Sequence, residues 1–355
     1  MAGKRVLMKG NEAVAEAAVR AGCRYFFGYP ITPQNEIPEY LSKRLPEVGG
    51  EFLQSESELA AANMLYGGAG AGGRCMTSSS SCGISLKSEG ISYIAAAEVP
   101  CVIVDMSRRG PGIGGLQPTQ SSYRQATKGG GHGGYRCLVF CPSSVQEAAD
   151  MMQDAFEMAE KYRMPAYVYA DGLIGQVMEP LTLKDFVDVD TIAKKPWAVS
   201  GPAGRPRNMV NSGMPEEKYE YFHKEKYPSI EKAEQKWADE NLADAEYVVT
   251  GFGTVGRIAA TAVKKVREKT GKKIGFIRPL LAWPFPQKGY DKIPDSVKGI
   301  LCIEANGGQM VEDVKQAING RIPVYFEGTY GSTMPTVDEV EAMIEKLGTG
   351  KEVRW

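Results

Sequence analysis

Histidine is scarce in this 355-residue sequence, which has only His132 and His223, and none of its seven cysteines forms a Cys-x-x-Cys pair. The usual ligand sets of zinc sites and iron–sulfur clusters are therefore missing. We predict no metal site in this chain. We expect its cysteines to be reduced and to pack as small apolar residues.

An excess of charge and a long hydrophobic run are missing as well. Lys and Arg total 42 against 43 Asp and Glu, for a net charge of −1, so neither nucleic acid nor an anionic membrane is indicated as a partner. The apolar runs, such as CVIV from Cys101, are far shorter than the ~20 residues of a membrane helix. The first ten residues lack the apolar segment of a signal peptide. We expect a soluble cytoplasmic protein without a membrane partner.

Short apolar runs alternate with helical patterns over the first half of the chain. The expected strands are RVLMKG, RYFFGYP, EFLQ, RCMTSSSS, VPCVIVDMS, YRCLVFCP and MPAYVYAD. This alternation predicts an α/β fold with a doubly wound, mainly parallel sheet that is covered on both faces.

Residues 181–242 have a different character, rich in Pro, Gly, aromatic and charged residues without a sustained period. The segment is longer than a usual connection, which predicts a linker or an arm that wraps a neighbour. A strand–helix–strand pattern then restarts. We therefore predict a first domain at 1–180, the arm at 181–242 and a smaller α/β domain at 243–355.

A glycine pattern in the second domain, Gly251-x-Gly253-x-x-Gly256, matches the dinucleotide fingerprint. The next strand ends at Arg278 without an acidic residue for a ribose hydroxyl, although an arginine would suit the 2′-phosphate of NADP. Tight packing alone also requires a glycine turn. An NADP-dependent oxidoreductase is one alternative at this point.

The stretch LQSESELAAAN, residues 53–63, places two glutamates where a small apolar helix should begin. Ser55-x-x-Glu58 predicts a capping box, in which Glu58 reaches back to the cap amide. Glu56, in the expected first turn, is left without a structural role.

Three further motifs follow expected strands, so a parallel sheet should bring them to one edge. Thr32, in Gly28-Tyr-Pro-Ile-Thr-Pro33, is either presented to a ligand by a stiff turn or caps the next helix. The run Thr77-Ser-Ser-Ser-Ser-Cys-Gly83 offers polar donors to a ligand or forms a solvated turn capped by Ser81. Arg108 and Arg109 suit a carboxylate, or form a surface pair.

Other catalytic sets are missing from the sequence. It has no plausible Ser/His/Asp set, no Walker lysine and no Gly-Asp-Gly magnesium motif. The edge therefore resembles half of a site, with the other half supplied by a partner.

The motifs GYPITPQ, QSESE, TSSSSCGISL, RRGPGIGG and TKGGGHGGYR resemble the alpha-type subunit of 2-oxoacid:ferredoxin oxidoreductases, most closely the type that acts on 2-oxoisovalerate (3-methyl-2-oxobutanoate). The resemblance covers nearly the whole chain. It implies a pyrimidine-binding thiamine diphosphate domain followed by a transketolase C-terminal-like domain.

The resemblance also implies residue roles. It places Glu56 at N1′ of the cofactor's aminopyrimidine, Thr32 near the reacting carbon and Arg108 at the carboxylate of the 2-oxoacid. The remaining residues expected at the cofactor are Pro30, Ile31, Ser80, Ser81 and Gly83, and Arg109 is expected near the substrate. Arg109 stands where the family has glycine, and Cys82 stands where the serine motif has proline.

The implied activity is coenzyme A-dependent oxidative decarboxylation of a 2-oxoacid to an acyl-CoA and carbon dioxide, with reduction of ferredoxin, in a hetero-oligomeric complex. A beta subunit would hold the diphosphate and Mg²⁺. The [4Fe-4S] clusters would lie in partner subunits, with small gamma and ferredoxin-like delta subunits expected. The alternatives are 2-oxoglutarate or pyruvate as substrate, an NADP-dependent oxidoreductase, and a non-catalytic interaction subunit.

Overall fold

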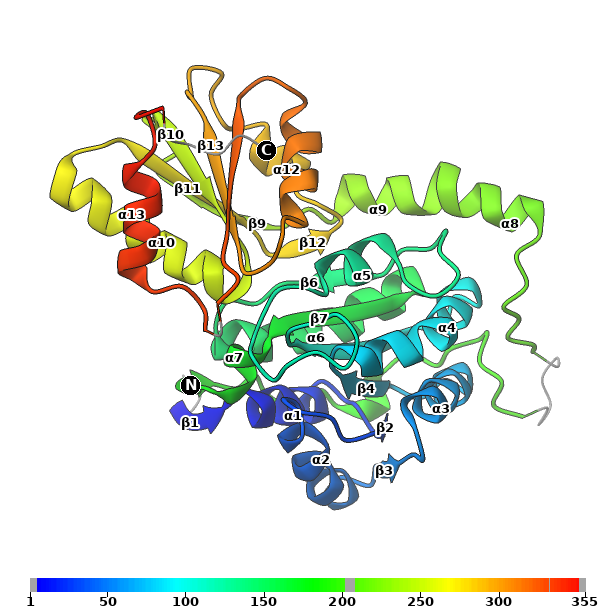
Figure 1. The fold of residues 1–355 in the computed structure, drawn as a ribbon. Helices are drawn as coiled ribbons and strands as arrows, with labels where there is room; N and C mark the ends of the chain where they lie inside the picture. The colour runs from blue at the N-terminus through cyan, green and yellow to red at the C-terminus, as the bar shows by residue number, and fades with distance from the viewer. Residues whose placement is uncertain (1–4, 202–207, 332, 351–355) are drawn as a thin grey trace.

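A computed structural model describes residues 5–201, 208–331 and 333–350. Two α/β parts stack on one another, and an arm of irregular chain and short helices joins them (Figure 1). The predicted α/β class with mainly parallel sheets is confirmed.

The N-terminal sheet has seven strands in the order β12-β6-β7-β5-β4-β2-β3, and they run parallel except for β12. The bounds are β2 Tyr25–Gly28, β3 Glu51–Gln54, β4 Cys75–Ser79, β5 Cys101–Ser107, β6 Leu138–Phe140, β7 Pro165–Asp171 and β12 Leu281–Trp283. Every residue of β5 is buried, as a near-continuous apolar run in a doubly covered sheet requires.

Helices cover both faces of this sheet. α1 packs against α6 on one face, and α3 packs against α4 on the other. The bounds are α1 Gly10–Arg20, α2 Glu36–Glu47, α3 Glu58–Gly70, α4 Cys82–Ala96, α5 Tyr123–Lys128, α6 Val145–Tyr162 and α7 Gly172–Gln176. α3 and α4 approach closely because they carry small residues: a Cβ at Gly90 would lie 2.7 Å from the Cβ of Ala62.

The first expected strand does not join the main sheet. β1 (Arg5–Lys9) forms and pairs antiparallel with β8 (Met178–Thr182) in a separate two-stranded sheet. The last strand of the first domain, β8, therefore lies beside the first strand of the chain, β1.

Parts of the arm contact the N-terminal domain of the same chain. Val199 N donates to the Gly70 carbonyl oxygen over 2.9 Å, and the Arg163 guanidinium lies 4.9 Å from the centre of the Trp197 ring. Its helical segments are η1 Val189–Thr191, α8 Glu216–Tyr221, η2 Phe222–Lys226 and α9 Tyr227–Ala233. Figure 1 shows α8 and α9 leading along the N-terminal domain to the C-terminal sheet.

The C-terminal sheet has the order β14-β13-β10-β11-β9, parallel except for β9. Its elements are β9 Trp237–Glu240, β10 Tyr247–Thr250, α10 Gly253–Thr270, β11 Ile274–Pro279, α11 Gln287–Tyr290, β13 Ile300–Glu304, α12 Met310–Ile318, β14 Val324–Gly328 and α13 Val337–Glu345. Two strands cross the expected boundaries: β9 comes from the segment expected to be arm, and β12 joins the sheet of the other domain.

Candidate active site

Loops that follow three neighbouring parallel strands form one edge of the N-terminal sheet. β2, β4 and β5 are adjacent, so their carboxyl ends meet there. Arg108 Nη1 donates to the Thr32 carbonyl oxygen over 2.7 Å, and Ser80 Oγ donates to the Met106 carbonyl oxygen over 2.6 Å. The structure therefore brings together Thr32, the serine run and Arg108.

The turn after β2 presents Thr32. Gln34 is buried and accepts a hydrogen bond from the Ser78 hydroxyl, which ties the turn to β4. α2 begins with Asn35 as its N-cap residue, so Thr32 is not the helix cap that the sequence allowed. Its side chain is exposed. Three residues of this turn are expected at the cofactor, and each of them is exposed or half-buried: Pro30, Ile31 and Thr32.

The serine run leads directly into α4. Ser81 is the N-cap residue, but its side chain makes no capping bond, and its φ of 50° lies in a region that side chains rarely adopt. A Cβ at Gly83 would lie 2.7 Å from Oε1 of Glu58, and closer still to Oγ of Ser79. Because glycine stands here, the Glu58 carboxyl and the Ser79 hydroxyl can pack directly against the start of α4, and we call this contact the cradle.

Arg108 is 7% exposed, and its guanidinium is only partly used. Nη2 donates to the Ile113 carbonyl oxygen over 3.1 Å, while Nε has no partner among the described residues. Nη1 is bound to Thr32 and Nη2 also contacts the Cys82 Sγ at 4.0 Å, so the Nε–H and one N–H of Nη1 are left without a partner among the described residues. Such a guanidinium can bind a carboxylate through two parallel hydrogen bonds.

A cavity of about 390 Å³ surrounds this guanidinium. Ser81, Cys82 and Arg108 line it from the N-terminal domain, and Gln309 lines it from the C-terminal domain. Gln309 is fixed there because its side chain donates to the Ser121 carbonyl oxygen over 2.9 Å. The C-terminal domain therefore helps to shape the pocket, which the sequence did not predict.

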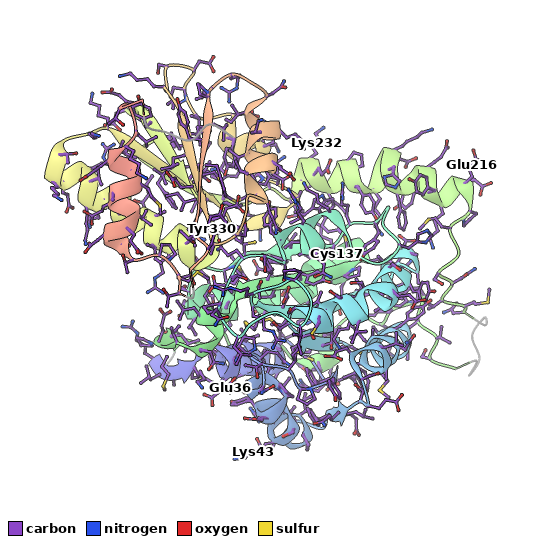
Figure 2. All side chains as sticks on the ribbon, viewed as in Figure 1. Glu36, Lys43, Cys137, Glu216, Lys232 and Tyr330 are labelled. Carbon is purple, nitrogen blue, oxygen red and sulfur yellow. The ribbon has the colours of Figure 1, made fainter. Side chains whose placement is uncertain are left out.

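Arg109 is placed differently from Arg108. Its Nη2 donates to the carbonyl oxygens of Tyr330 and Gly331, and Figure 2 places Tyr330 where the C-terminal domain meets the N-terminal domain. The guanidinium thus joins the two domains. Its hydrogen bonds go to protein carbonyls, which leaves it less available to a substrate than Arg108.

The positions of Glu56 and Glu58 relative to α3 differ from those expected from the sequence. Ser57 caps α3 by accepting from Ala60 N, whereas the Ser55 hydroxyl donates to the Gly28 carbonyl oxygen over 3.0 Å, so the Ser55 capping box is wrong. Glu56 precedes the helix, is exposed and makes no hydrogen bond or ion pair with described residues. Glu58 begins α3, is 7% exposed and faces the cradle.

Asp105, on β5, is a buried acid that sequence reasoning missed. Neither of its carboxyl oxygens has a hydrogen-bond partner in the described part of the chain. Its neighbours across the sheet are Ser79 on β4 and Tyr169 on β7, whose hydroxyls also lack partners there. Burial raises the pKa of Asp105 to about 8, and the Ser122 hydroxyl offsets part of this rise. The carboxyl group therefore carries its proton at neutral pH.

The glycine fingerprint serves domain packing. Asp171, at the end of β7, accepts from Thr254 N over 2.9 Å and from Thr254 Oγ1 over 2.7 Å at the start of α10. A Cβ at Gly253 would lie 2.9 Å from the same carboxylate. Asp171 thus occupies the helix N-terminus that a dinucleotide pyrophosphate would need, which argues against the NADP alternative.

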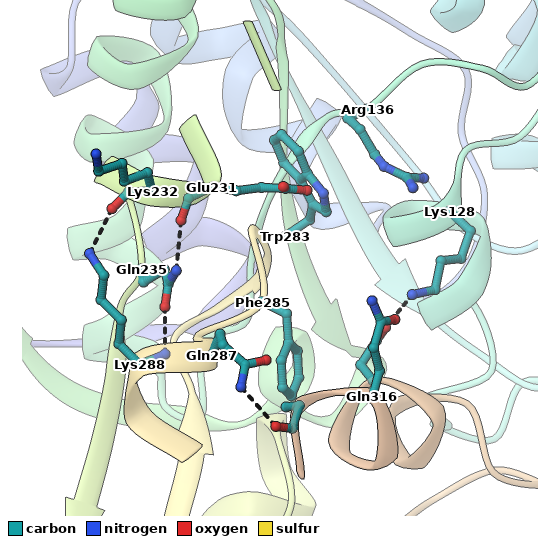
Figure 3. A pocket seen from close by; sticks show the side chains of 12 residues that line it. Lys128, Arg136, Glu231, Lys232, Gln235, Trp283, Phe285, Gln287, Lys288 and Gln316 are labelled. Atoms are coloured by element: carbon teal, nitrogen blue, oxygen red, sulfur yellow. Dashed lines mark hydrogen bonds and ion pairs between the residues drawn. The ribbon is translucent and has the colours of Figure 1, made fainter. Parts of the chain in front are cut away.

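A cavity of about 480 Å³ lies away from this edge, where α5, α9 and the C-terminal domain meet. Figure 3 shows Trp283 and Phe285 in its wall, with Lys128 directed toward α12. Lys128 forms an ion pair with Asp313, and Lys288 Nζ donates to the Lys232 carbonyl oxygen over 2.7 Å. None of the residues expected at the cofactor lines this cavity.

The described residues contain no group of three His, Cys, Asp or Glu side chains that could hold a metal ion. Six of the seven cysteines are buried, among them Cys137, labelled in Figure 2, and Cys82 is half-buried. Within the same residues, no helix is both long and apolar enough to cross a membrane.

Comparisons with known proteins identify the family of this chain. Residues 16–244 match the family described as pyruvate flavodoxin/ferredoxin oxidoreductase, thiamine diphosphate-binding, and residues 245–340 match pyruvate:ferredoxin oxidoreductase core domain II. The chain belongs to this family.

Curated relatives cover most of the chain. The ketoisovalerate oxidoreductase subunit VorB of Methanothermobacter thermautotrophicus is 41% identical, over 98% of this chain and 99% of the relative, and that of Methanothermobacter marburgensis is 44% identical, over 88% and 89%. The 2-oxoglutarate synthase subunit KorA of Methanocaldococcus jannaschii is 34% identical, over 95% and 98%.

Solved structures show the same fold at lower identity. The 2-oxoglutarate:ferredoxin oxidoreductase from Magnetococcus marinus superposes with a TM-score of 0.83 at 23% identity, covering 97% of this chain and 65% of that chain. A split-gene transketolase in an inactive beta4 tetramer superposes with a TM-score of 0.60 at 13% identity, covering 96% of this chain and 98% of that chain.

Proposed function

We propose that this chain is the pyrimidine-binding subunit of a 2-oxoacid:ferredoxin oxidoreductase that acts on 2-oxoisovalerate and related branched-chain 2-oxoacids. The reaction is coenzyme A-dependent oxidative decarboxylation to an acyl-CoA and carbon dioxide, with reduction of ferredoxin. The observation that carries the proposal is the buried carboxyl group of Glu58 at Gly83, the residue that follows Cys82 in the wall of the Arg108 pocket.

The cradle fits the aminopyrimidine of thiamine diphosphate. The cofactor supplies, when bound, a carbon nucleophile for the carbonyl of the 2-oxoacid. Glu58 has a buried carboxyl group without a side-chain partner among described residues, and it packs against Gly83 at the start of α4. We assign to Glu58, rather than to the exposed Glu56, the carboxylate that shares a proton with N1′ of the ring.

Arg108 binds the carboxylate of the substrate in this proposal. Its guanidinium lines a cavity together with Ser81 and Cys82, and its Nε–H and one N–H of Nη1 have no partner among the described residues. A second carboxylate, as in 2-oxoglutarate, would need another cation, and Arg109 is engaged with the carbonyls of Tyr330 and Gly331. An apolar branched side chain makes no such demand, in line with the similarity to VorB.

The rest of the machinery is assigned to partners. A beta subunit would hold the diphosphate and Mg²⁺, because the described residues contain no metal-binding cluster of their own. Small gamma and ferredoxin-like delta subunits, the [4Fe-4S] clusters and ferredoxin itself complete the proposal. This chain would bind and orient, while electrons would leave through its partners.

A matched pair of glutamine variants tests the assignment. In the purified complex, Glu58→Gln should lower turnover roughly 100-fold or more, because an amide cannot share a proton with the ring. Glu56→Gln should change turnover less than about twofold, since the Glu56 side chain makes no hydrogen bond or ion pair with a described residue. Viologen-dye reduction with 2-oxoisovalerate and coenzyme A is the measurement. The reverse pattern would restore Glu56 to the role, and full activity of both variants would favour a non-catalytic interaction subunit.

Substrate preference is tested in the same assay. We expect 2-oxoisovalerate to react fastest and other branched 2-oxoacids to follow in a graded series, since each methylene in an apolar pocket discriminates by only about 1–3 kcal/mol. Pyruvate and 2-oxoglutarate should be slower. A rate for 2-oxoglutarate more than about tenfold above that of 2-oxoisovalerate would contradict this and implicate Arg109.

A further inference from the structure

Lys87, on α4, is a buried lysine without an ion pair. Its exposed fraction is 0%, and it is among the largest fully buried side chains. Lys226, the other lysine described as buried, has a clear structural role, because it pairs with Glu98 over 2.8 Å. Lysine is rarely buried without a partner because desolvating its charge is costly. Lys87 therefore needs a different explanation.

The position of Lys87 points to Glu58. Lys87 lies one helical turn after Gly83, so both lie on the same side of α4. Its Nζ donates to the Glu58 carbonyl oxygen over 3.5 Å, across the close contact between α3 and α4. Ammonium and carboxylate thus belong to one buried region, although the structure shows no ion pair between them.

The charges around this region are few. Burial lowers the pKa of Lys87 to about 8, and the charge of Glu58 opposes this. On β4, Ser79 contributes a neutral hydroxyl, and on β5, Asp105 is protonated at neutral pH. Arg108 is directed to the carbonyls of Thr32 and Ile113. Of these groups, Lys87 is the cation that contacts Glu58, at its carbonyl oxygen.

We propose that Lys87 is a positioning residue: its buried ammonium, held at the Glu58 carbonyl oxygen between α3 and α4, supplies the positive charge beside which the Glu58 carboxylate works. This inference rests on the role of Glu58 proposed above. A carboxylate withdrawn from water takes up a proton readily, and a nearby cation counteracts this. Loss of the lysine charge should therefore narrow the pH range of turnover on its acid side.

The test uses the assembled complex and the pH dependence of kcat/KM. Lys87→Met should move the acid limb to higher pH by roughly one unit or more, because an opposite charge at short range lowers a carboxyl pKa by about that amount. Lys87→Gln should do the same and serves if the Met variant fails to assemble. Lys87→Arg should return the acid limb toward wild type, and Lys226→Met, the buried control, should leave it in place.

A second measurement does not depend on activity. Urea unfolding of the full chain with Lys87→Met, Glu58→Gln and the double variant should show coupling, such that the effect of Lys87→Met changes when Glu58 is neutral. Coupling together with the moved limb supports the proposal. An acid limb at the wild-type pH in an assembled Lys87→Met or Lys87→Gln complex overturns the proposal. Additive effects of the two substitutions on the free energy of unfolding overturn it as well. Full activity of Glu58→Gln would refute the proposed role of Glu58 instead, whatever the coupling shows.

Discussion

Cys82 is the residue at which the candidate pocket can be probed most directly. It is the one cysteine of the chain that is not buried, and it lines the cavity that contains Arg108. Burial raises the pKa of Cys23 to about 12, and it raises the pKa values of Cys75, Cys101, Cys137, Cys141 and Cys302 as well. Those thiols are poor nucleophiles, because the thiolate is the reactive form.

We expect a small alkylating reagent to modify Cys82 first in the folded complex and to abolish turnover by filling the pocket. A 2-oxoacid bound at Arg108 should slow the modification. Peptide mass mapping together with residual activity measures both effects, and Cys82→Ala removes the labelled position as a control. Inactivation at the same rate with and without saturating substrate would place the substrate elsewhere.

Asp105 predicts a pH dependence of stability. Its pKa is about 8 in the folded chain against an ordinary value of 3.8, so the folded state binds this proton more tightly than the unfolded state does. The protonated Asp105 contributes its full share to the free energy of unfolding below about pH 4, and this contribution is lost as the pH rises through about 8. In Asp105→Asn the side chain does not ionise, so this pH-dependent decrease in stability should disappear. Urea midpoints between pH 4 and 8 test it, with Asp295→Asn, an exposed position, as the control.

At the scale of elements, the strands could be predicted and several of their partners could not. The apolar runs that lead to the site became β2, β4 and β5 within a residue or two, because a buried parallel strand reads as a continuous apolar run. β9 and β12 are short, and they pair with strands far from them in the sequence or in the other domain. The local sequence pattern of a strand does not indicate with which distant strand it pairs.

The start of α3 shows where local reasoning fails at the site. Two serines precede the helix, and either one suits an N-cap by composition. Ser55 instead holds the end of β3 to the Gly28 carbonyl, which leaves the cap to Ser57 and frees Glu58 for the cradle. The sequence interpretation had assigned Glu58 to capping and thereby directed the catalytic role to Glu56. Thr32, the serine run and Arg108, in contrast, could be placed from the ends of their strands.

At the scale of the whole molecule, Asp171 predicts how the domains depend on one another. Its buried carboxylate satisfies Thr254 at the start of α10, and Ile174 N donates to it at 3.4 Å. Asp171→Ala should lower the free energy of unfolding by roughly 1–3 kcal/mol, because buried donors are left without partners.

One core cluster contains residues of both domains, from Ala13 to Phe326, so the Asp171→Ala chain should still unfold in a single transition at a lower urea midpoint. Glu312→Ala is the control, since it breaks an exposed ion pair with Arg124 across the same boundary. Two separate transitions would show that Asp171 alone couples the domains.

β12 comes late in the sequence but pairs in the N-terminal sheet, so that sheet cannot be completed early during synthesis on the ribosome. β6 is the outermost parallel strand of that sheet and is completed only when Leu281–Trp283 pairs with it. Until synthesis has passed the arm and reached Trp283 in the second domain, β6 offers an open row of amides and carbonyls, a template for self-association. A nascent chain that stalls between the domains would therefore need a chaperone, although its first sheet is otherwise built.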